Sequence, residues 1–463
     1  MLRPPAPRPL GPVPALLRHL AEPERDLLAL LPADAYRRRV GRLGHSRRLI
    51  LLVNDPVQVR EIMGPRAREF PKNDLFAGAL SPLVRDSVFT SAGETWARQR
   101  RLVDPAFGHM QVRRAFPRMA EAVDDAETRL DAAAARGEAV ALDAAMSRVT
   151  ADVVFRAIFG ESLETSAAKE IFEAFAAFQR SVAHVDAARL ILGRPFAPTP
   201  VSPECREACD TIRGRLREWI AARMAAPARE DLCSALIAAR DPEGGPAFDL
   251  EDLVDTVGVF FLAGHETTAG ALTWALWMLS EDAGAAARLR AETEAEAGSG
   301  PIPLGAVKRL VRARAAFREA MRLYPPLAFL PRVALQPTEI DGISVPRGAM
   351  VMVSPWTLHR SPDLWAQADR FDPDRFLPER ERAVEPGSYI PFGLGERICV
   401  GAAFATVEAT LILARLMRRY RFEAVAPETA RPLARLTLRP AQPLLMRVRR
   451  RDTAEPAPAV TAA

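Results

Sequence analysis

Cysteine is scarce in this sequence, and the few copies stand at spacings that exclude several kinds of metal site. They are Cys205, Cys209, Cys233 and Cys399 among 463 residues. None forms a C-x-x-C pair, and their separations match neither a zinc site nor a cysteine-ligated iron–sulfur cluster. So few cysteines in so long a chain indicate a reducing, cytoplasmic setting. Cys205 and Cys209 share a helix face by their spacing, and we interpret them as buried, inert thiols.

Lysine is scarcer still, so arginine carries almost all of the positive charge. Lysine occurs only at Lys72, Lys169 and Lys308, within 63 basic and 58 acidic residues and a net charge of +5. Arginines that are scattered and balanced in this way, without interleaved aromatic residues, do not make the basic stripe of a nucleic-acid-binding protein. We expect no nucleic-acid partner, whereas a local basic face for an acidic protein partner stays open beside plain solvated surface.

The sequence also lacks a clear membrane anchor. Residues 1–20, "MLRPPAPRPLGPVPALLRHL", are rich in proline and lack the continuous apolar segment of a signal peptide. Residues 257–279, "VGVFFLAGHETTAGALTWALWML", do have the length of a membrane span. However, the polar run "HETT" at 265–268 would be costly in lipid, and no second span accompanies it. We therefore predict a buried helix of a soluble protein and no membrane span.

The remaining pattern indicates a mainly α protein with small β-sheets. Apolar spacing is helical through most of 92–298, and Asp249 is a suitable N-cap for a helix of about 30 residues that runs to about Asp282. Further helices are expected near 307–324 and 402–420, and strands near 48–56 and on both sides of a turn at Asp341-Gly342. We expect a proline-rich lead over 1–20, one domain over 21–448 and a disordered tail over 449–463.

One short stretch, "PFGLGERICVG" at 391–401, sets a cysteine among three glycines just ahead of a long apolar helix. Gly393 and Gly395 resemble the start of a dinucleotide fingerprint, but Ile398 stands where its third glycine belongs. The stretch is instead a turn that allows close backbone approach and delivers Cys399 to the start of a helix. Free N–H groups there favour a thiolate, which is a strong metal ligand.

This stretch resembles the haem-binding loop of the cytochrome P450 family, F-x-x-G-x-R-x-C-x-G, with every defining position filled. The resemblance implies that Cys399 is the axial ligand of a haem iron. It also implies that Phe392 packs beside the sulfur, that Gly393 belongs to the cofactor-binding turn, and that Arg397 pairs with a haem propionate. The alternative for Cys399 is a small buried core thiol.

Three weaker stretches follow the order of the same family. "EAMR" places Glu319 and Arg322 at i,i+3, which alone reads as a surface ion pair. In the family such a pair holds a third group from the segment before the cysteine loop, and "FDPDRF" supplies Arg375 there. Asp374 stands where many relatives have glutamate. This network would brace the fold and take no part in the chemistry.

The stretch "AGHETTAG" at 263–270 resembles the family's oxygen-activation motif on the long central helix. Thr267 can turn its hydroxyl toward a backbone carbonyl, and a buried Glu266 would have a raised pKa and could relay protons. A zinc motif is excluded because H-E-x-x-H needs histidine where Ala269 stands. The alternative is that Thr267 and Glu266 are only polar residues satisfied within the core.

"WARQRR" at 96–101 resembles the early helix whose tryptophan and arginine reach the haem edge. Trp96 and Arg100 lie at i,i+4 and could both meet a propionate, although an aromatic and a cation on one helix are also common without a ligand. Arg332 in "FLPR" is a further propionate partner. By the same resemblance, the substrate pocket is lined by Phe89, Phe260, Phe261, Ala263, Leu327 and Phe329.

The implied protein is a soluble bacterial-type monooxygenase with haem b between the long central helix and the final helix. It would insert one oxygen atom of O2 into an apolar substrate, by hydroxylation or epoxidation, as a monomer. Electrons from NAD(P)H would come through a ferredoxin or flavodoxin and its reductase, docked on an arginine-rich face that includes Arg98 and Arg101. Two alternatives stay open: a peroxygenase or isomerase, and a non-enzymatic haem sensor or electron carrier.

Overall fold

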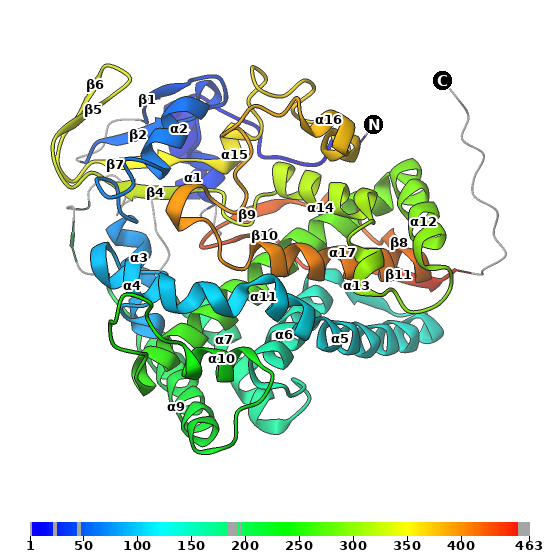
Figure 1. Ribbon diagram of the computed structural model, residues 1–463. Coiled ribbons are helices and arrows are strands. Elements are labelled where there is room, and N and C mark those ends of the chain that lie inside the picture. The colour runs from blue at the N-terminus through cyan, green and yellow to red at the C-terminus, as the bar shows by residue number, and fades with distance from the viewer. Residues whose placement is uncertain are drawn as a thin grey trace.

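The helix predicted over 249–282 is α11 (Leu250–Glu281), which runs through the centre of the computed structural model (Figure 1). The structure describes residues 2–21, 26–43, 48–182, 193, 196–197 and 199–451. Asp249 caps α11 as expected: its side chain accepts the N–H of Asp252 at 2.7 Å, and the Asp252 side chain accepts the N–H of Asp249 at 3.5 Å. Most side chains of α11 are buried, which a helix apolar on nearly every side requires.

Helices make up most of the described chain, in agreement with the predicted fold class. They are α1 (Pro12–Ala21), α2 (Pro56–Met63), α3 (Asp74–Val84), α4 (Gly93–Val103), α5 (His109–Arg136), α6 (Leu142–Phe159), α7 (Ser166–Ser181), α9 (Pro203–Ala225), α10 (Leu232–Ala238), α11, α12 (Ala283–Ala297), α13 (Leu304–Val307), α14 (Val311–Leu323), α15 (Pro355–Leu358), α16 (Pro378–Glu381) and α17 (Ala402–Arg419). The predicted helices near 307–324 and 402–420 are therefore α14 and α17.

The strands form small sheets beside the helices. The largest sheet has the order β1 (Val40–Arg42), β2 (Ile50–Val53), β7 (Met350–Val353) and β4 (Leu330–Val333), with β2 and β7 parallel and the other pairs antiparallel. A second sheet has the order β3 (Ala139–Ala141), β11 (Leu445–Arg450) and β8 (Tyr420–Ala424). Two hairpins complete the set: β5 (Thr338–Ile340) with β6 (Ile343–Val345), and β9 (Pro432–Ala434) with β10 (Leu438–Pro440). In Figure 1 the sheet that contains β1 and the hairpin of β5 and β6 lie at the upper left, and β8 and β11 lie on the right.

The turn predicted at Asp341-Gly342 joins β5 to β6. Both residues have positive φ, 51° and 73°, and Ile340 pairs with Ile343 across them. A two-residue turn with positive φ at both positions matches the twist of a hairpin, and aspartate followed by glycine is a preferred pair for it. The local sequence therefore sets the register of this hairpin.

In the structure, a helix spans the first predicted domain boundary and a strand spans the second. Residues 12–20 of the lead belong to α1, which begins with proline at a position where the missing N–H costs nothing. The earlier lead also packs on the domain, because the Tyr324 hydroxyl donates to the Pro5 carbonyl at 2.7 Å. At the other end, β11 continues through Arg450, which pairs with Tyr420 of β8. The rest of the predicted tail, 452–463, lies outside the described residues.

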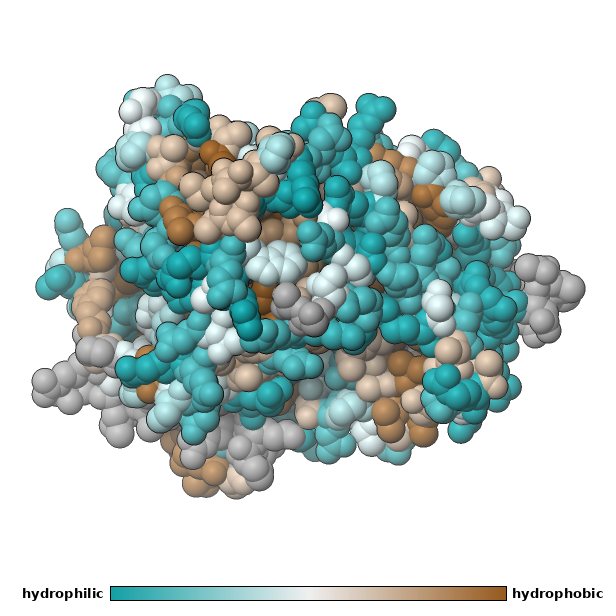
Figure 2. Space-filling model, turned by 90° about the horizontal axis from the view of Figure 1, so that it is seen from below, coloured by the Kyte–Doolittle hydropathy of each residue, from teal (hydrophilic) through white to brown (hydrophobic). Residues whose placement is uncertain are grey.

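The core of the domain places α17 beside α11 and α14, and these helices lie close together in Figure 1. Among the residues that the structure describes, no helix is both long and apolar enough to span a lipid bilayer. The face shown in Figure 2 is mostly hydrophilic, with apolar residues in small separate patches. The membrane-length stretch at 257–279 is thus the buried part of α11, as predicted.

Candidate active site

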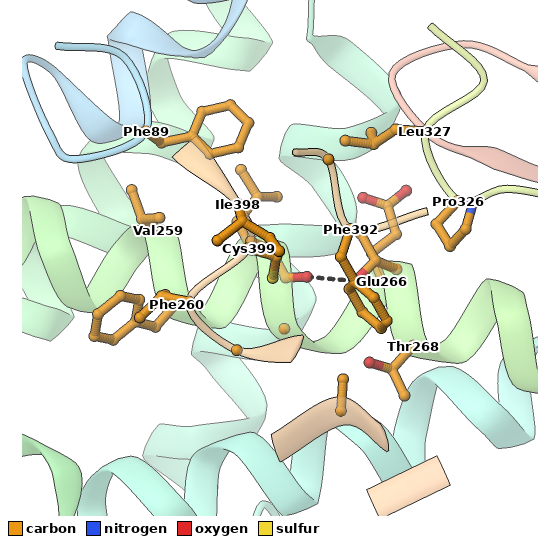
Figure 3. A pocket seen from close by; sticks show the side chains of 18 of the residues that line it. Phe89, Val259, Phe260, Glu266, Thr268, Pro326, Leu327, Phe392, Ile398 and Cys399 are labelled. Atoms are coloured by element: carbon orange, nitrogen blue, oxygen red, sulfur yellow. Dashed lines mark hydrogen bonds between the residues drawn. The ribbon is translucent and has the colours of Figure 1, made fainter. Parts of the chain in front are cut away.

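An internal cavity of about 280 Å³ lies between α11 and the loop that leads into α17. Its walls come from α3, α4, α6, α11, α14, β4, the loop over 391–401 and the turn between β9 and β10. Figure 3 shows Cys399 near the middle of this space, with Val259 and Phe260 of α11 on one side and Pro326 and Leu327 on the other. The sequence motifs that stand far apart along the chain therefore meet around one cavity.

The turn that carries Cys399 is fixed by its glycines. Gly395 has φ of 73°, and a Cβ there would lie 1.9 Å from the carbonyl oxygen of Met63 at the end of α2. Only glycine allows this contact between the loop and α2. The backbone N–H of Cys399 donates to the Phe392 carbonyl at 2.9 Å, which closes the turn. The loop therefore holds the Cys399 sulfur against the cavity.

Cys399 differs from the other cysteines in what its sulfur faces. It lies deep in the protein, yet its side chain is exposed to the cavity, whereas Cys205, Cys209 and Cys233 are buried in the packed core. Burial raises the pKa of the Cys399 thiol, while the N–H of Gly401 and the nearby cations partly oppose the rise. The position of Cys399 at a helix N-terminus would by itself lower the pKa of the thiol and favour the thiolate. The pKa of Cys399 is instead raised, because desolvation is the larger effect. No group of three or more His, Cys, Asp or Glu side chains able to hold a metal occurs among the described residues.

Four cations border the same cavity: Lys72, Arg100, Arg332 and Arg397. Burial lowers the pKa of Arg332 and of Arg397 to about 10 each, and burial with the repulsion of Arg332 and Arg397 lowers that of Lys72 well below its usual value. Like charges crowded beside a cavity are costly unless an anion joins them. One buried nitrogen of Arg397, Nη1, has no hydrogen-bond partner among the described residues.

These observations fit haem with its two propionates. A dianionic ligand edge would neutralise the cations and supply an acceptor for Arg397 Nη1, while Cys399 faces the same space with a sulfur suited to iron. Arg397 is also positioned for the task, because its guanidinium lies over the Trp96 ring at 4.4 Å and its Nη2 donates to the Ser91 carbonyl at 2.9 Å. Arg332 is held in β4, next to Lys72 across an isolated β-bridge.

Trp96 and Arg100 both reach the cavity from α4, as their spacing predicts. Arg100 Nη1 donates to the Ile398 carbonyl at 2.7 Å, and its Nε pairs with Asp104 at 2.6 Å. Arg100 therefore ties α4 to the cysteine loop directly. Phe392 and Gly393 also line the cavity.

On α11, Thr267 and Glu266 face the cavity together. The Thr267 hydroxyl donates to the Ala263 carbonyl at 2.7 Å, which is the hydrogen bond that its sequence position predicts. The Glu266 Oε1 accepts the hydroxyl of Thr437 at 2.6 Å, and burial raises the pKa of this carboxyl, as expected. A carboxyl group with a raised pKa and a hydroxyl thus lie next to each other on the cavity wall.

The predicted pocket residues reach the cavity with one exception. Phe89, Phe260, Ala263, Leu327 and Phe329 line it. The prediction for Phe261 is wrong: this side chain packs on Phe155 and Phe175 at ring-centroid distances of 6.3 and 4.5 Å. The rotation of α11 therefore turns Phe261 toward α6 and α7 and away from the cavity. Phe260 meets Phe107 edge to face at 4.8 Å instead.

Glu319, Arg322 and Arg375 meet in the core, away from the cavity. Arg322 Nε and Nη2 donate to the two carboxylate oxygens of Glu319 at 2.7 and 2.8 Å, and Arg375 Nε lies 3.4 Å from the same carboxylate. Arg322 also donates to the carbonyls of His359, Ala368 and Arg370, each at 2.8 Å. The contact is therefore a buried network and no surface ion pair.

Sequence reasoning gave no role to three polar residues that line the cavity: Lys72, Glu408 and Thr437. Lys72 Nζ donates to the Phe89 carbonyl at 2.7 Å. The only feature of the sequence that could have drawn attention to Lys72 is that lysine occurs at just three positions. Glu408 of α17 is buried, and burial alone raises its pKa well above the usual value. Thr437 lies in a turn whose position against α11 no local pattern reveals.

Comparison with known proteins agrees with this site. A family model described as Cytochrome P450 matches residues 36–446. Cyclooctatin synthase of Streptomyces melanosporofaciens is 33% identical over 427 residues, which cover 90% of this chain and 90% of that enzyme. Cyclooctat-9-en-7-ol 5-monooxygenase of the same organism is 32% identical over 424 residues, again 90% of each chain. The crystal structure of the cytochrome P450DA heme domain shares the fold, with a TM-score of 0.82 at 24% identity and coverage of 97% of each chain.

Cys399 faces a cavity bordered by four cations, and the family model spans residues 36–446. The chain therefore belongs to the cytochrome P450 family and is a haem-thiolate monooxygenase that uses haem b, O2 and electrons delivered from NAD(P)H by redox partners.

Proposed function

We propose that this monooxygenase hydroxylates or epoxidises a neutral cyclic terpenoid. The observation that carries the proposal is the lining of the cavity around Phe89 and Phe260, which is almost wholly apolar; it includes Leu80, Val84, Val88, Val154, Ile158, Val259, Leu327, Phe329 and Leu436. The two relatives, named for cyclooctatin and cyclooctat-9-en-7-ol, act on terpenoids. A largely apolar pocket with a few hydroxyls suits a hydrocarbon skeleton that carries at most an alcohol.

The substrate class is tested by optical titration of the purified haem protein. Cyclic diterpene alcohols and hydrocarbons are expected to displace water beside the iron and to produce the low-to-high spin shift. A fatty acid of equal carbon number is the matched control, and we expect it to bind at least about tenfold more weakly, because the cations of the cavity are engaged by the propionates. Tighter binding of the fatty acid would overturn the proposal.

Each turnover requires RH, O2, two electrons and two protons, and yields ROH and water. Haem with its thiolate ligand, when bound through Cys399, supplies O–O bond cleavage. We infer that Glu266 carries protons to the cavity and that Thr267 Oγ1 receives them and positions them for the oxygen being reduced. Burial keeps Glu266 protonated to a higher pH than an exposed glutamate, which supports this role.

The reductant is proposed to be an acidic one-electron carrier of the ferredoxin or flavodoxin type. Arg98 and Arg101 are weaker docking candidates than their positions suggested, because Asp252 lies 3.4 Å from Arg98 and Asp241 lies 2.8 Å from Arg101. Exposed Arg113 and Arg114 on the first turns of α5 make no ion pair with any residue that the structure describes.

The start of α5 also lies beside the cysteine loop. A Cβ on Gly401 would lie 3.9 Å from Phe107, which stands just before Gly108, the N-cap of α5. Met110 is 60% exposed and shares a helix face with Arg113 and Arg114 at i,i+3 and i,i+4. An exposed apolar residue beside unpaired cations, close to the cysteine ligand, suits a transient electron-transfer contact with an acidic protein.

Charge reversal at these arginines is expected to weaken docking. In Arg113→Glu and Arg114→Glu, the KM for the reduced carrier should rise by about tenfold at low salt, and the difference should shrink as ionic strength rises. Arg206→Glu, an exposed arginine of α9, is the matched control and should keep the parent KM. Equal KM values for all three variants would place docking elsewhere.

A further inference from the structure

The carboxyl of Glu266 is held by a residue from the far end of the chain. Thr437, which is 8% exposed, donates its hydroxyl to Glu266 Oε1 at 2.6 Å. Thr437 stands in the turn between β9 and β10, and its neighbour Leu436 lines the cavity. A single turn therefore presents an apolar side chain to the substrate space and a hydroxyl to the acid on α11.

The turn is tied to the two walls that a substrate would contact. The Leu438 N–H donates to the Pro326 carbonyl at 2.8 Å, and Pro326 lines the cavity beside Leu327. On the other side, a Cβ on Gly270 of α11 would lie 3.1 Å from the Leu438 carbonyl, so this backbone packs closely on the helix one turn beyond Glu266. A displacement at Leu436 is thereby transmitted to Thr437 and to its hydrogen bond.

Other groups around the carboxyl act on it more weakly than Thr437 does. Arg439 of β10 acts on Glu266 through its charge, and a hydrogen bond with the Gln179 side chain of α7 lowers the pKa of Glu266 less than the hydrogen bond with Thr437 does. His265 on the same helix is neutral, because burial lowers its pKa to about 4, and its Nδ1 is bonded to the Phe261 carbonyl at 2.6 Å. Thr437 is the one hydroxyl within hydrogen-bond distance of Glu266 in the described part of the chain.

We propose that Thr437 is a positioning residue that couples occupancy of the cavity to proton delivery. With the cavity empty of substrate, Thr437 holds Glu266 against the β9–β10 turn; a substrate that presses on Leu436 releases the carboxyl so that it can turn toward Thr267. The only bond exchanged is this hydrogen bond, and the released Thr437 hydroxyl turns to water. The inference rests on the proposed role of Glu266 in carrying protons.

The test compares Thr437→Val, which removes the hydroxyl at nearly constant volume, with Thr437→Ser, which keeps it. In Thr437→Val the carboxyl is free even when the cavity holds no substrate, so this variant should form hydrogen peroxide from O2 and the reduced carrier without substrate about tenfold faster than the parent, the scale of one hydrogen bond to an ionisable group. Thr437→Ser, which keeps the hydroxyl, should keep the parent's slow rate. Peroxide-driven turnover, in which hydrogen peroxide brings the oxygen atom, both electrons and both protons, should be unchanged.

A second readout does not depend on turnover. The infrared band of the protonated Glu266 carboxyl, assigned by its loss in Glu266→Gln, should move when the Thr437 hydroxyl is removed and should stay in place in Thr437→Ser. Because the Thr437 hydroxyl favours the ionised form of Glu266, its loss should raise the pKa of Glu266. The pH dependence of the coupling between O2 consumption and product formation should therefore shift to higher pH. Thr273→Val is the matched control: its buried hydroxyl bonds only to the Ala269 carbonyl of α11.

The outcomes separate the two levels of inference. If Glu266→Gln stays as tightly coupled as the parent, the role of Glu266 is wrong whatever Thr437 does. If Glu266→Gln uncouples while Thr437→Val keeps the parent's substrate-free peroxide formation and infrared band, the inference about Thr437 alone is overturned. An equal rise of substrate-free peroxide formation in Thr273→Val would also overturn it, since the effect would then follow from any buried threonine.

Discussion

Replacing Cys399 by serine is expected to abolish the oxidising activity while the fold survives. The serine hydroxyl is a poor ligand for haem iron and does not push electron density toward oxygen as a thiolate does. O2-dependent product formation should fall by about a thousandfold or more, the scale of removing a group that drives a reaction. The reduced protein with carbon monoxide should lose the absorption band of thiolate ligation.

The control for this substitution is Cys205→Ser. Cys205 is a thiol of α9 that is buried in the core and does not border the cavity. It should keep the parent's spectrum and turnover, with at most a modest loss of stability. A Cys399→Ser protein with the parent's spectrum and activity would show that the sulfur is no ligand, and the assignment of the site would fail.

The parts of the site that the sequence predicts are those in which one short segment determines its own geometry. The bounds of α11 follow from Asp249 and the apolar pattern behind it. The turn at Cys399 follows from Gly393 and Gly395, whose φ of 76° and 73° glycine adopts readily. Thr267 bonds back to Ala263 within one helical turn. Each of these depends on neighbours within a few residues.

The parts that the sequence does not predict depend on tertiary packing. Lys72 forms a β-bridge with Arg332, which is 260 residues away in the sequence. Thr437 forms a hydrogen bond with Glu266, which is 171 residues away. The family resemblance placed Phe261 in the pocket, but the rotation of α11 decides which face each residue covers. Composition showed proline in the lead, whereas only contacts such as that of Tyr324 with Pro5 show that the lead belongs to the domain.

The second large effect is expected at Arg322, whose guanidinium uses all five of its N–H donors. Two go to Glu319 and three to the carbonyls of His359, Ala368 and Arg370, in a site with no exposure to solvent. Arg322→Lys keeps the charge but offers only three donors from a single nitrogen, so buried acceptors lose their partners. We expect the free energy of unfolding to fall by about 3–5 kcal/mol, measured by urea denaturation.

This loss should also reach the cofactor site, because the network continues toward the cysteine loop. His359, neutral because burial lowers its pKa to about 3, accepts the N–H of Ile390 at 2.9 Å, and the Ile390 carbonyl accepts the N–H of Gly393 at 3.0 Å. Arg322→Lys should therefore lower the haem content of the purified protein as well as its stability. The matched control is Arg309→Lys, whose side chain is 59% exposed and pairs with Glu296 at 2.6 Å; it should cost at most about 1 kcal/mol and keep full haem content. Equal stability of the two variants would mean that the buried network does not brace the loop, and that the fold holds Cys399 in place by other contacts.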